Sequence, residues 1–311
     1  MRKKRIRQNR TGHPGGFFIW PAETSPQFAE SNQYEKIWRN HTLHVITSQV
    51  LFIFCFLLLI HSIETLAYAT RLSGARVGFI ASALSLFNVM VIVSRMSNMV
   101  QQPFTGHLID AAGSNALSVV SAQFRFLIFG STVGTMLGIC LLPTFVALFT
   151  RAIIHLADGG GSVMQVFKKG FSLNGLKQAR SYIRLPSVSY LKGLQFRMIP
   201  KRLFVINMVI TSIYTIGVLS ALYAGLLAPE HSTTAVMASG LINGVATMLL
   251  AVFVDPKVSV LADDVAKGKR SYVSLKWTSL TMVTSRVAGT LLAQLVFIPG
   301  AYYIAWVTNW L

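Results

Sequence analysis

The sequence has 311 residues, of which 53% are hydrophobic and only 12% are charged, and its mean hydropathy is +0.55. Soluble domains carry about 25% charged residues, so this composition excludes a soluble globular protein and predicts an integral membrane protein. The 28 Lys and Arg outnumber the 10 Asp and Glu, which predicts an anionic partner, either the membrane surface with its anionic lipids or an anionic substrate, and no nucleic acid.

Residues 1–42 are polar and begin with the basic run RKKRIR, which predicts a flexible N-terminal tail before a transmembrane domain at 43–311. Six apolar segments follow, each near the roughly 20 residues that cross a bilayer. Backbone groups in lipid must be satisfied within their own segment, so the fold is expected to be all-α and polytopic. The six predicted spans are 43–69, 77–100, 124–149, 203–227, 233–254 and 275–308, the last kinked at Pro299.

The first span carries a polar stripe. His61, Glu64, Tyr68 and Arg71 follow one another at intervals of three, four and three residues, which places them on one face of a helix that continues past residue 69. A charge at the bilayer centre costs about 2.5–3.5 kcal/mol, so these residues are candidates for function. Glu64 is the one acid within the first four predicted spans, and Arg71 or Arg286 is its expected partner. A purely structural role for Glu64 or His61 stays open.

The second span carries a second polar stripe at intervals of three, four or seven residues, before Pro103 is expected to end the helix. In lipid such a face is predicted to turn inward, toward protein or water. Two alternatives remain: the long Arg95 side chain could reach the membrane surface, and the asparagines could serve as interhelical hydrogen bonds. The members of the stripe are Ser85, Asn88, Arg95, Asn98 and Gln102.

Small residues mark the third span. Gly130, Gly134 and Gly138 recur every four residues, a spacing that predicts close packing of another helix against this face. Further along, Asn207, Thr211 and Tyr214 in the fourth span and Arg286 with Thr290 in the sixth are expected to add to the inward polar surface.

A single offset of 155 residues aligns the two halves of the chain, with one match in each of three spans. An odd number of spans would insert a duplicated unit upside down, so the matches predict a 3+3 inverted repeat, the architecture of many alternating-access transporters. The matched residues are Tyr68 with Tyr223, Asn88 with Asn243, and Gly134-Thr135 with Gly289-Thr290. Chance matching of apolar sequence is the alternative.

The long loop 150–202 contains the basic amphipathic segment VMQVFKKGFSLNGLKQARSYIRL, which is predicted to lie in the headgroup plane of an anionic membrane, either fixing orientation or gathering substrate. This loop holds ten Lys and Arg, and 255–277 holds five. The positive-inside rule therefore slightly favours a cytoplasmic location for both segments, with the two termini outside. The eight basic residues of the tail lie on the opposite side and favour the reverse orientation, which stays open.

Signatures of an enzyme are few. The Asp263-Asp264 pair in LADDVAKGK resembles part of a metal-binding acid motif, but basic residues follow where a further Asp would be needed. Neither a phosphate-binding GxxxxGK[ST] loop nor an HExxH motif occurs. Neither a metal nor another cofactor is therefore expected, and the protein is not expected to be an enzyme.

Two stretches resemble the Amj family of bacterial membrane proteins, the alternate lipid II flippases. They are ETLAYATRLSGARVGFIASALSLFNVMVIVSRMSNMVQQP and FGSTVGTMLGICLLPTF, and the strongest parts are ETLAYATRLSGAR and LFN followed by SRMSN. The resemblance covers roughly residues 42–311, and the basic tail departs from the family pattern.

The resemblance implies transport of lipid II, an undecaprenyl-pyrophosphate-linked disaccharide-peptide, across the bacterial cytoplasmic membrane during cell wall synthesis. Arg95 and Arg286 would be phosphate ligands, because a planar guanidinium suits pyrophosphate, and Glu64 a counter-ion or proton carrier. An ion-coupled transporter of a small anion, a membrane-embedded lipid-biosynthetic enzyme and a non-transporting scaffold are the alternatives. The implied substrate-binding residues are Glu64, Arg71, Asn88, Arg95, Asn98 and Arg286, with His61, Tyr68, Arg76, Gln102 and Arg125 as secondary candidates.

Overall fold

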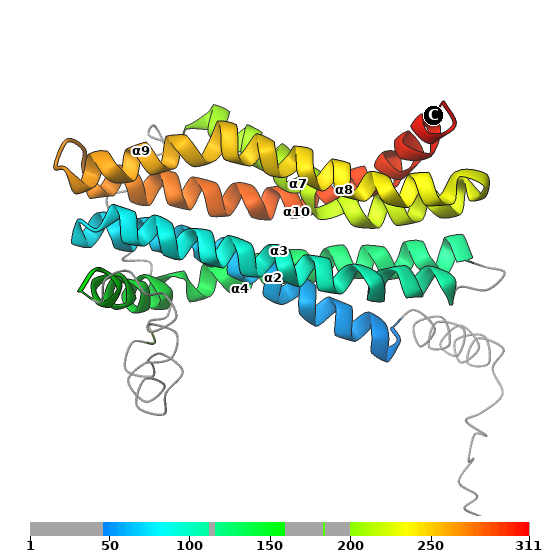
Figure 1. The fold of residues 1–311 in the computed structure, drawn as a ribbon, viewed down its shortest axis with the longest axis horizontal. Coiled ribbons are helices and arrows are strands. Elements are labelled where there is room, and N and C mark those ends of the chain that lie inside the picture. The colour runs from blue at the N-terminus through cyan, green and yellow to red at the C-terminus, as the bar shows by residue number, and fades with distance from the viewer. Residues whose placement is uncertain (1–45, 112–115, 159–182, 184–199, 311) are drawn as a thin grey trace, which may run out of the picture. The chain divides into compact units, whose positions relative to one another are not determined.

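The computed structural model describes residues 46–111, 116–158, 183 and 200–310 (Figure 1). Within these ranges every regular element is a helix, and six helices are long and apolar enough to cross a membrane. The predictions of an all-α fold and of six spans are therefore confirmed. The predicted tail 1–42 and the basic segment at the centre of the loop 150–202, except Ile183, lie outside the described residues.

The fifth span, Pro229–Ala266, is composite, because it consists of four consecutive elements that begin with the 3-10 turn Pro229–His231. One of them, Leu250–Val254, is π-helical, a form that is rare and is often found at functional sites. The helices are α2 (Ser48–Val77), α3 (Ile80–Asp110), α4 (Ala116–Asp158), α7 (Lys201–Leu227), α8 (Ser232–Leu249), α9 (Asp255–Ala266) and α10 (Tyr272–Thr308).

Several helices extend beyond their predicted ends. The α2 helix continues to Val77 and stops at Gly78, whose φ of 81° ends the helix in the left-handed region. The predicted end at Pro103 is wrong, because α3 runs on to Asp110. Likewise α4 continues to Asp158, so the first residues of the predicted loop 150–202 are helical. Membrane helices tolerate an internal proline because neighbouring groups satisfy the backbone group that it frees.

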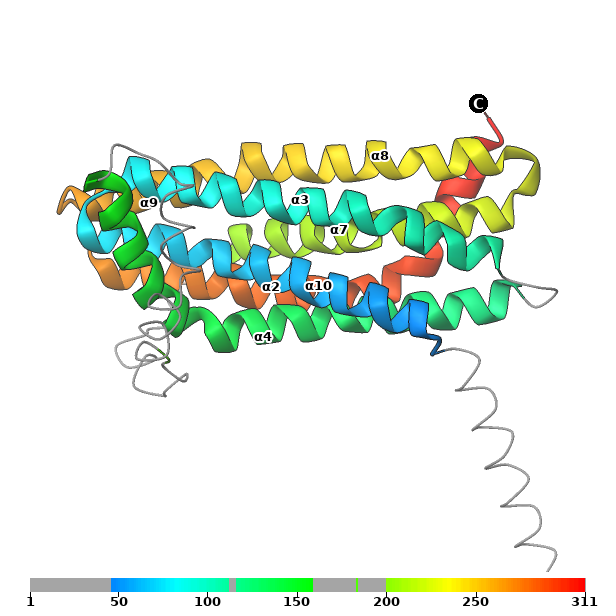
Figure 2. The ribbon, with the colours of Figure 1, turned by 60° about the horizontal axis from the view of Figure 1, so that its bottom comes forward.

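The described helices form two layers (Figure 1). One layer contains α2, α3 and α4, with α2 packed against both of the others; the second contains α7, α8, α9 and α10, with α7 packed against α8 and α10. The α10 helix contains Pro299 and still continues to Thr308, and Figure 2 shows its C-terminal part turning away from the rest of the helix, as the predicted kink requires. The central helices α2 and α7 are the most buried of the spans.

The glycine spacing of the third span packs α4 against α2, as predicted. A Cβ atom added to Gly134 would lie 2.4 Å from the carbonyl oxygen of Leu58, and one added to Gly138 would lie 2.7 Å from Cβ of Thr65. The hydroxyl of Ser62 donates a hydrogen bond to the carbonyl oxygen of Gly134 at 2.8 Å. The two backbones are therefore in direct contact, which only small residues permit.

We expect Gly134→Ala to lower the thermal unfolding midpoint of the purified protein, because the new methyl group overlaps the α2 backbone and overpacking costs about 1–3 kcal/mol. Gly106→Ala is the matched control, since a Cβ atom there meets nothing within 4 Å. It should leave the midpoint unchanged or raise it, because alanine favours a helix by about 1 kcal/mol over glycine. Equal midpoints for the two variants would contradict this packing.

The two central helices have the same burial pattern. Residues 51–75 of α2 and 201–225 of α7 match position by position in being buried, half-buried or exposed. The packing of the glycines agrees, because Gly134 lies on the Leu58 carbonyl and Gly289 lies on the Met208 carbonyl. By these contacts Leu58 in the first span corresponds to Met208 in the fourth, an offset of 150 residues, whereas Gly134 in the third span corresponds to Gly289 in the sixth, an offset of 155. A single ungapped offset therefore does not relate the two halves of the chain. The inverted repeat itself stays a prediction.

Candidate functional site

The Glu64 carboxylate joins the two layers. Arg286 of α10 donates a hydrogen bond to its Oε2 atom and forms an ion pair with it, while the Ser94 hydroxyl of α3 donates to Oε1 at 2.8 Å. The Arg286 and Glu64 side chains are only 6% and 11% exposed. Of the two partners predicted for Glu64, the structure therefore selects Arg286. A buried pair of this kind holds the layers together only while both charges are present.

A second ion pair also crosses between the layers. Arg71 of α2 donates to Oδ1 of Asp255, the first residue of α9, at 2.8 Å, and its guanidinium carbon lies 4.0 Å from the centre of the Phe87 ring. The Arg71 side chain is 2% exposed, and its Nε and Nη1 atoms have no hydrogen-bond partner among the described residues. Tyr68, one turn earlier, is buried beside it, with its ring centre 5.9 Å from the guanidinium. Arg71 is thus a buried cation with unused donors.

Arg95 crosses between the layers without a carboxylate partner. It donates to the hydroxyl of Thr247 in α8, and its guanidinium carbon lies 5.0 Å from the centre of the Tyr214 ring in α7. A cation over an aromatic face gains about 0.5–2 kcal/mol. The half-buried Arg95 therefore reaches inward across the layer boundary in this structure, whereas the alternative prediction had its side chain reaching the membrane surface.

We call the group formed by Glu64, Arg95, Tyr214 and Arg286, which lies between the two layers of helices, the polar layer. An apolar cluster closes the polar layer at each of its two ends. Along α2 one cluster precedes Glu64 and the other follows it, and the same separation holds around Tyr214 in α7 and Arg286 in α10. Cluster A includes Val50, Ile53, Leu57, Phe124, Leu219 and Phe297. Cluster B includes Tyr68, Leu72, Leu203, Ile210, Leu275 and Met282.

The cavity beside the polar layer is small. It is lined in part by His61, Asn98 and Gln101 and has a volume of about 20 Å³, room for roughly one water molecule. His61 is 2% exposed, and its Nδ1 atom has no hydrogen-bond partner among the described residues. The polar layer is therefore closed in this structure, with water-sized space next to it.

Other predicted residues lie away from the polar layer. The expectation that Asn88 faces inward is wrong, because it is exposed, and Gln102 is half-buried. Arg76 is exposed in the last turn of α2. The exposed Arg125 of α4 donates to the carbonyl oxygen of Gln294 in α10 at 3.0 Å, and the Gln294 amide donates back to the Arg125 carbonyl at 2.8 Å. Arg125 thus joins the layers at a different level, beside cluster A, with its guanidinium carbon 6.0 Å from the centre of the Phe297 ring.

Sequence reasoning missed three partners of the charged residues. Asp255 lay just beyond the predicted end of the fifth span, Ser94 is next to Arg95 but was not placed on the stripe, and Thr247 had no distinguishing signal. Asp255 could have been noticed from the sequence, because it is the next acid after Glu230 and lies at the predicted membrane boundary of the fifth span. Its pairing with Arg71, which is 184 positions away, could not have been predicted from local sequence.

We expect Asp255→Asn to destabilise the protein by about 1–3 kcal/mol, because the buried Arg71 charge would lose its carboxylate while partial exposure of residue 255 lets water compensate in part. The measurement is the thermal unfolding midpoint. Asp263→Asn is the control, since Asp263 and Lys267 form a surface pair with side chains 40% and 58% exposed, worth about 0–1 kcal/mol. A similar loss in both variants would rule out a special role for the Arg71–Asp255 pair in stability.

The Asp263-Asp264 pair is engaged with basic residues. Asp263 lies 2.5 Å from Nζ of Lys267, and Asp264 lies 3.7 Å from Nε of Arg270. Among the described residues no group of three His, Cys, Asp or Glu side chains is placed to hold a metal ion.

Fold and site together define a multi-pass helical membrane protein with buried arginines and carboxylates between two layers of helices, an arrangement typical of transport proteins. The sequence profile of the family described as "Amj: Alternate to MurJ" matches residues 56–308. The protein named "Lipid II flippase Amj" from Bacillus subtilis (strain 168) is 86% identical over 268 residues, which is 86% of this chain and 100% of the relative. The chain belongs to the Amj family. No solved structure matches it.

Proposed function

We propose that this protein is a lipid II flippase, a transporter rather than an enzyme, that moves the undecaprenyl-linked peptidoglycan precursor across the bacterial cytoplasmic membrane. The name of the Bacillus subtilis relative supports the substrate. The observation that carries the proposal is the set of three arginines, Arg71, Arg95 and Arg286, that cross between the two layers at buried or half-buried positions.

The arginines suit the chemistry of the substrate. The headgroup of lipid II carries a pyrophosphate, and a guanidinium can donate two parallel hydrogen bonds to phosphate oxygens. In the closed state Glu64 and Asp255 occupy Arg286 and Arg71, respectively. An entering pyrophosphate would compete with these carboxylates, so that the buried charges stay compensated with and without substrate. Asn98 and His61, which line the water-sized cavity, would contact the sugars.

Clusters A and B would serve as the two gates. Each contains apolar contacts between the layers, together with one polar link, Arg125 with Gln294 at cluster A and Arg71 with Asp255 at cluster B. Within a layer, by contrast, α2 and α4 are joined by direct backbone contact. Opening at cluster B would expose the polar layer to one side of the membrane, and opening at cluster A would expose it to the other. This is alternating access by rigid layers around a fixed site.

The prenyl tail needs a lateral exit, and the seam between α3 and α8 is the best candidate. The Arg95–Thr247 hydrogen bond crosses this seam, and Figure 2 shows the two helices side by side. The outward residues near it include Met96, Met99 and Met248, which are 60%, 69% and 66% exposed. Methionine side chains are flexible and adapt to irregular apolar partners. Binding of the headgroup by Arg95 would break the bond that closes the seam.

The test is translocation of lipid II with a fluorescent headgroup label in liposomes that contain the purified protein. Transport is measured as the fraction of label that a membrane-impermeant quencher reaches over time. We expect exchange between leaflets to be faster than in protein-free liposomes, and unchanged in Lys257→Gln, which removes an exposed charge outside the polar layer. Folded wild-type protein that moves no lipid II, or that instead takes up a small soluble anion, would overturn the proposal.

A further inference from the structure

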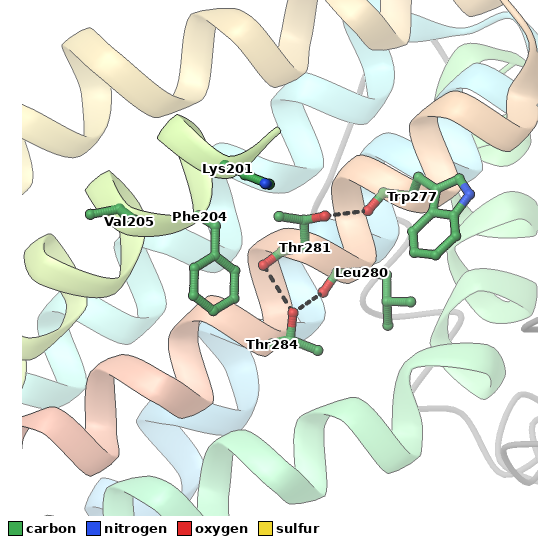
Figure 3. A pocket seen from close by; sticks show the side chains of 7 residues that line it. All are labelled: Lys201, Phe204, Val205, Trp277, Leu280, Thr281 and Thr284. Atoms are coloured by element: carbon green, nitrogen blue, oxygen red, sulfur yellow. Dashed lines mark hydrogen bonds between the residues drawn. The ribbon is translucent and has the colours of Figure 1, made fainter. Parts of the chain in front are cut away.

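An apolar groove lies between the starts of α7 and α10 (Figure 3). Its volume is about 480 Å³, within the range of about 300–1,000 Å³ that is usual for ligand pockets. It is lined by Lys201, Phe204, Val205, Trp277, Leu280, Thr281 and Thr284. Val205 is 51% exposed, so the groove opens on the outer surface of these helices.

The walls offer little to a polar ligand. The Thr281 hydroxyl donates to the carbonyl oxygen of Trp277 at 2.9 Å, and the Thr284 hydroxyl donates to the carbonyl oxygens of Leu280 at 2.8 Å and Thr281 at 3.1 Å. Both hydroxyls are thus turned back onto their own helix, as the dashed lines in Figure 3 show. The chemistry of the walls therefore matches a hydrocarbon chain.

The rim of the groove carries a positive charge. Lys201, the first residue of α7, is the basic residue among those that line the groove. Among the seven lining residues there is no acid. Basic pockets between transmembrane helices at a membrane surface bind anionic lipid headgroups, and a lysine can keep its ammonium group at that surface while its stem lies along apolar walls.

We propose that this groove binds an anionic phospholipid, with one acyl chain between α7 and α10 and the phosphate at Lys201. The proposal goes beyond transport, because it assigns a lipid that stays bound to the outer side of one layer. Apolar walls select the chain, and the basic rim selects the charge of the headgroup.

The geometry favours a phospholipid over the tail of the transported substrate. Arg286 follows Thr284 by two residues, so it points to the opposite side of α10 from the groove. The two helices are also closed against each other, because Asn207 of α7 donates to the carbonyl oxygen of Met282 at 3.1 Å and to the hydroxyl of Ser285 at 2.7 Å. A tail in the groove could not be joined to a headgroup in the polar layer unless α7 and α10 separated.

Trp277 provides the readout, because it lines the groove and its fluorescence is quenched by bromine on a nearby acyl chain. The other four tryptophans are replaced by phenylalanine, and the protein is placed in phosphatidylcholine nanodiscs with rising fractions of brominated phosphatidylglycerol or brominated phosphatidylcholine. We expect phosphatidylglycerol to reach half-maximal quenching at about a fivefold lower fraction, as one basic residue near an anionic headgroup predicts. The replaced residues are Trp20, Trp38, Trp306 and Trp310.

Two pairs of variants separate charge from shape. Lys201→Gln should abolish the preference for phosphatidylglycerol, whereas Lys269→Gln, which removes an exposed charge outside the groove, should retain it. Thr284→Phe should fill the groove and reduce quenching by either lipid, whereas Leu291→Phe, at a 54% exposed position of the same helix, should not.

The proposal is overturned if both brominated lipids quench equally in the wild-type background, or if Thr284→Phe leaves quenching unchanged. It is also overturned if lipid II at an amount equal to the phosphatidylglycerol displaces it, since the groove would then hold the substrate tail. Selective quenching in a protein that moves no lipid II would leave this site standing and contradict only the proposed function.

Discussion

Replacing Arg286 with glutamine is expected to abolish lipid II translocation and to destabilise the fold. Arg286 is the ion-pair partner of Glu64, and both side chains are almost fully buried. Removing one partner of a buried pair costs about 3–5 kcal/mol, because the other charge stays buried without compensation. The same change removes a proposed ligand of the pyrophosphate. Both effects are measured on one preparation, as the thermal unfolding midpoint and as the rate of headgroup exchange in liposomes.

The double variant Glu64→Gln with Arg286→Gln separates the two effects. It leaves no uncompensated charge, so the unfolding midpoint should return close to that of the wild type. Translocation should stay absent, because the cation is still missing. If the double variant recovers both stability and transport, the pair is structural and Arg286 is not a ligand. Glu64→Gln alone tests the carboxylate, and normal transport in that variant would exclude a role for it as counter-ion or proton carrier.

Arg95→Gln is expected to reduce translocation about tenfold to a hundredfold with little change in stability. Losing a hydrogen bond to a charged phosphate costs roughly 1.5–3 kcal/mol, and each 1.4 kcal/mol is a factor of ten. Arg95 contacts the neutral Thr247 hydroxyl and the Tyr214 ring, and the buried Glu64 carboxylate keeps Arg286 as its ion-pair partner when Arg95 is removed. The unfolding midpoint should therefore stay near that of the wild type, in contrast to Arg286→Gln.

Two further variants test whether Arg95 acts through its own contact with the substrate. Arg95→Lys keeps the charge but loses the planar pair of donors, so transport should fall between the wild type and Arg95→Gln. Thr247→Val removes the hydrogen-bond partner while keeping Arg95, and transport should stay within about a factor of three of the wild type. A larger loss in Thr247→Val than in Arg95→Gln would mean that the seam contact, and not the cation, is what transport requires.

The helices and the first polar stripe could be predicted because both depend on local sequence. Apolar length gave the six spans, and the 3-4-3 spacing from His61 to Arg71 correctly kept α2 helical to Val77. The helix ends were less predictable. Hydropathy indicates where the apolar part of a span ends, but the helices α3 and α4 continue beyond that point. Pro103 shows this most directly, because it was expected to end the helix and lies within α3.

The inward face of α3 could not be read from polar spacing alone. Its buried residues include Phe87, Met90, Ser94 and Gln101, a face rotated away from the exposed Asn88. Arg95 lies at the flank of this face, and its length carries the guanidinium to α8. Apolar and small polar residues mark the packed side here, and on hydropathy they resemble residues that face lipid.

The π-helical segment Leu250–Val254 places Asp255 where Arg71 can reach it. A π turn holds one residue more than an α turn. If the segment relaxed to α-helical geometry, every residue after it would rotate about the helix axis by about 100°, and the Asp255 carboxylate would swing away from Arg71. The contact between the layers at Arg71 therefore depends on the π-helical geometry of this one segment of the fifth span.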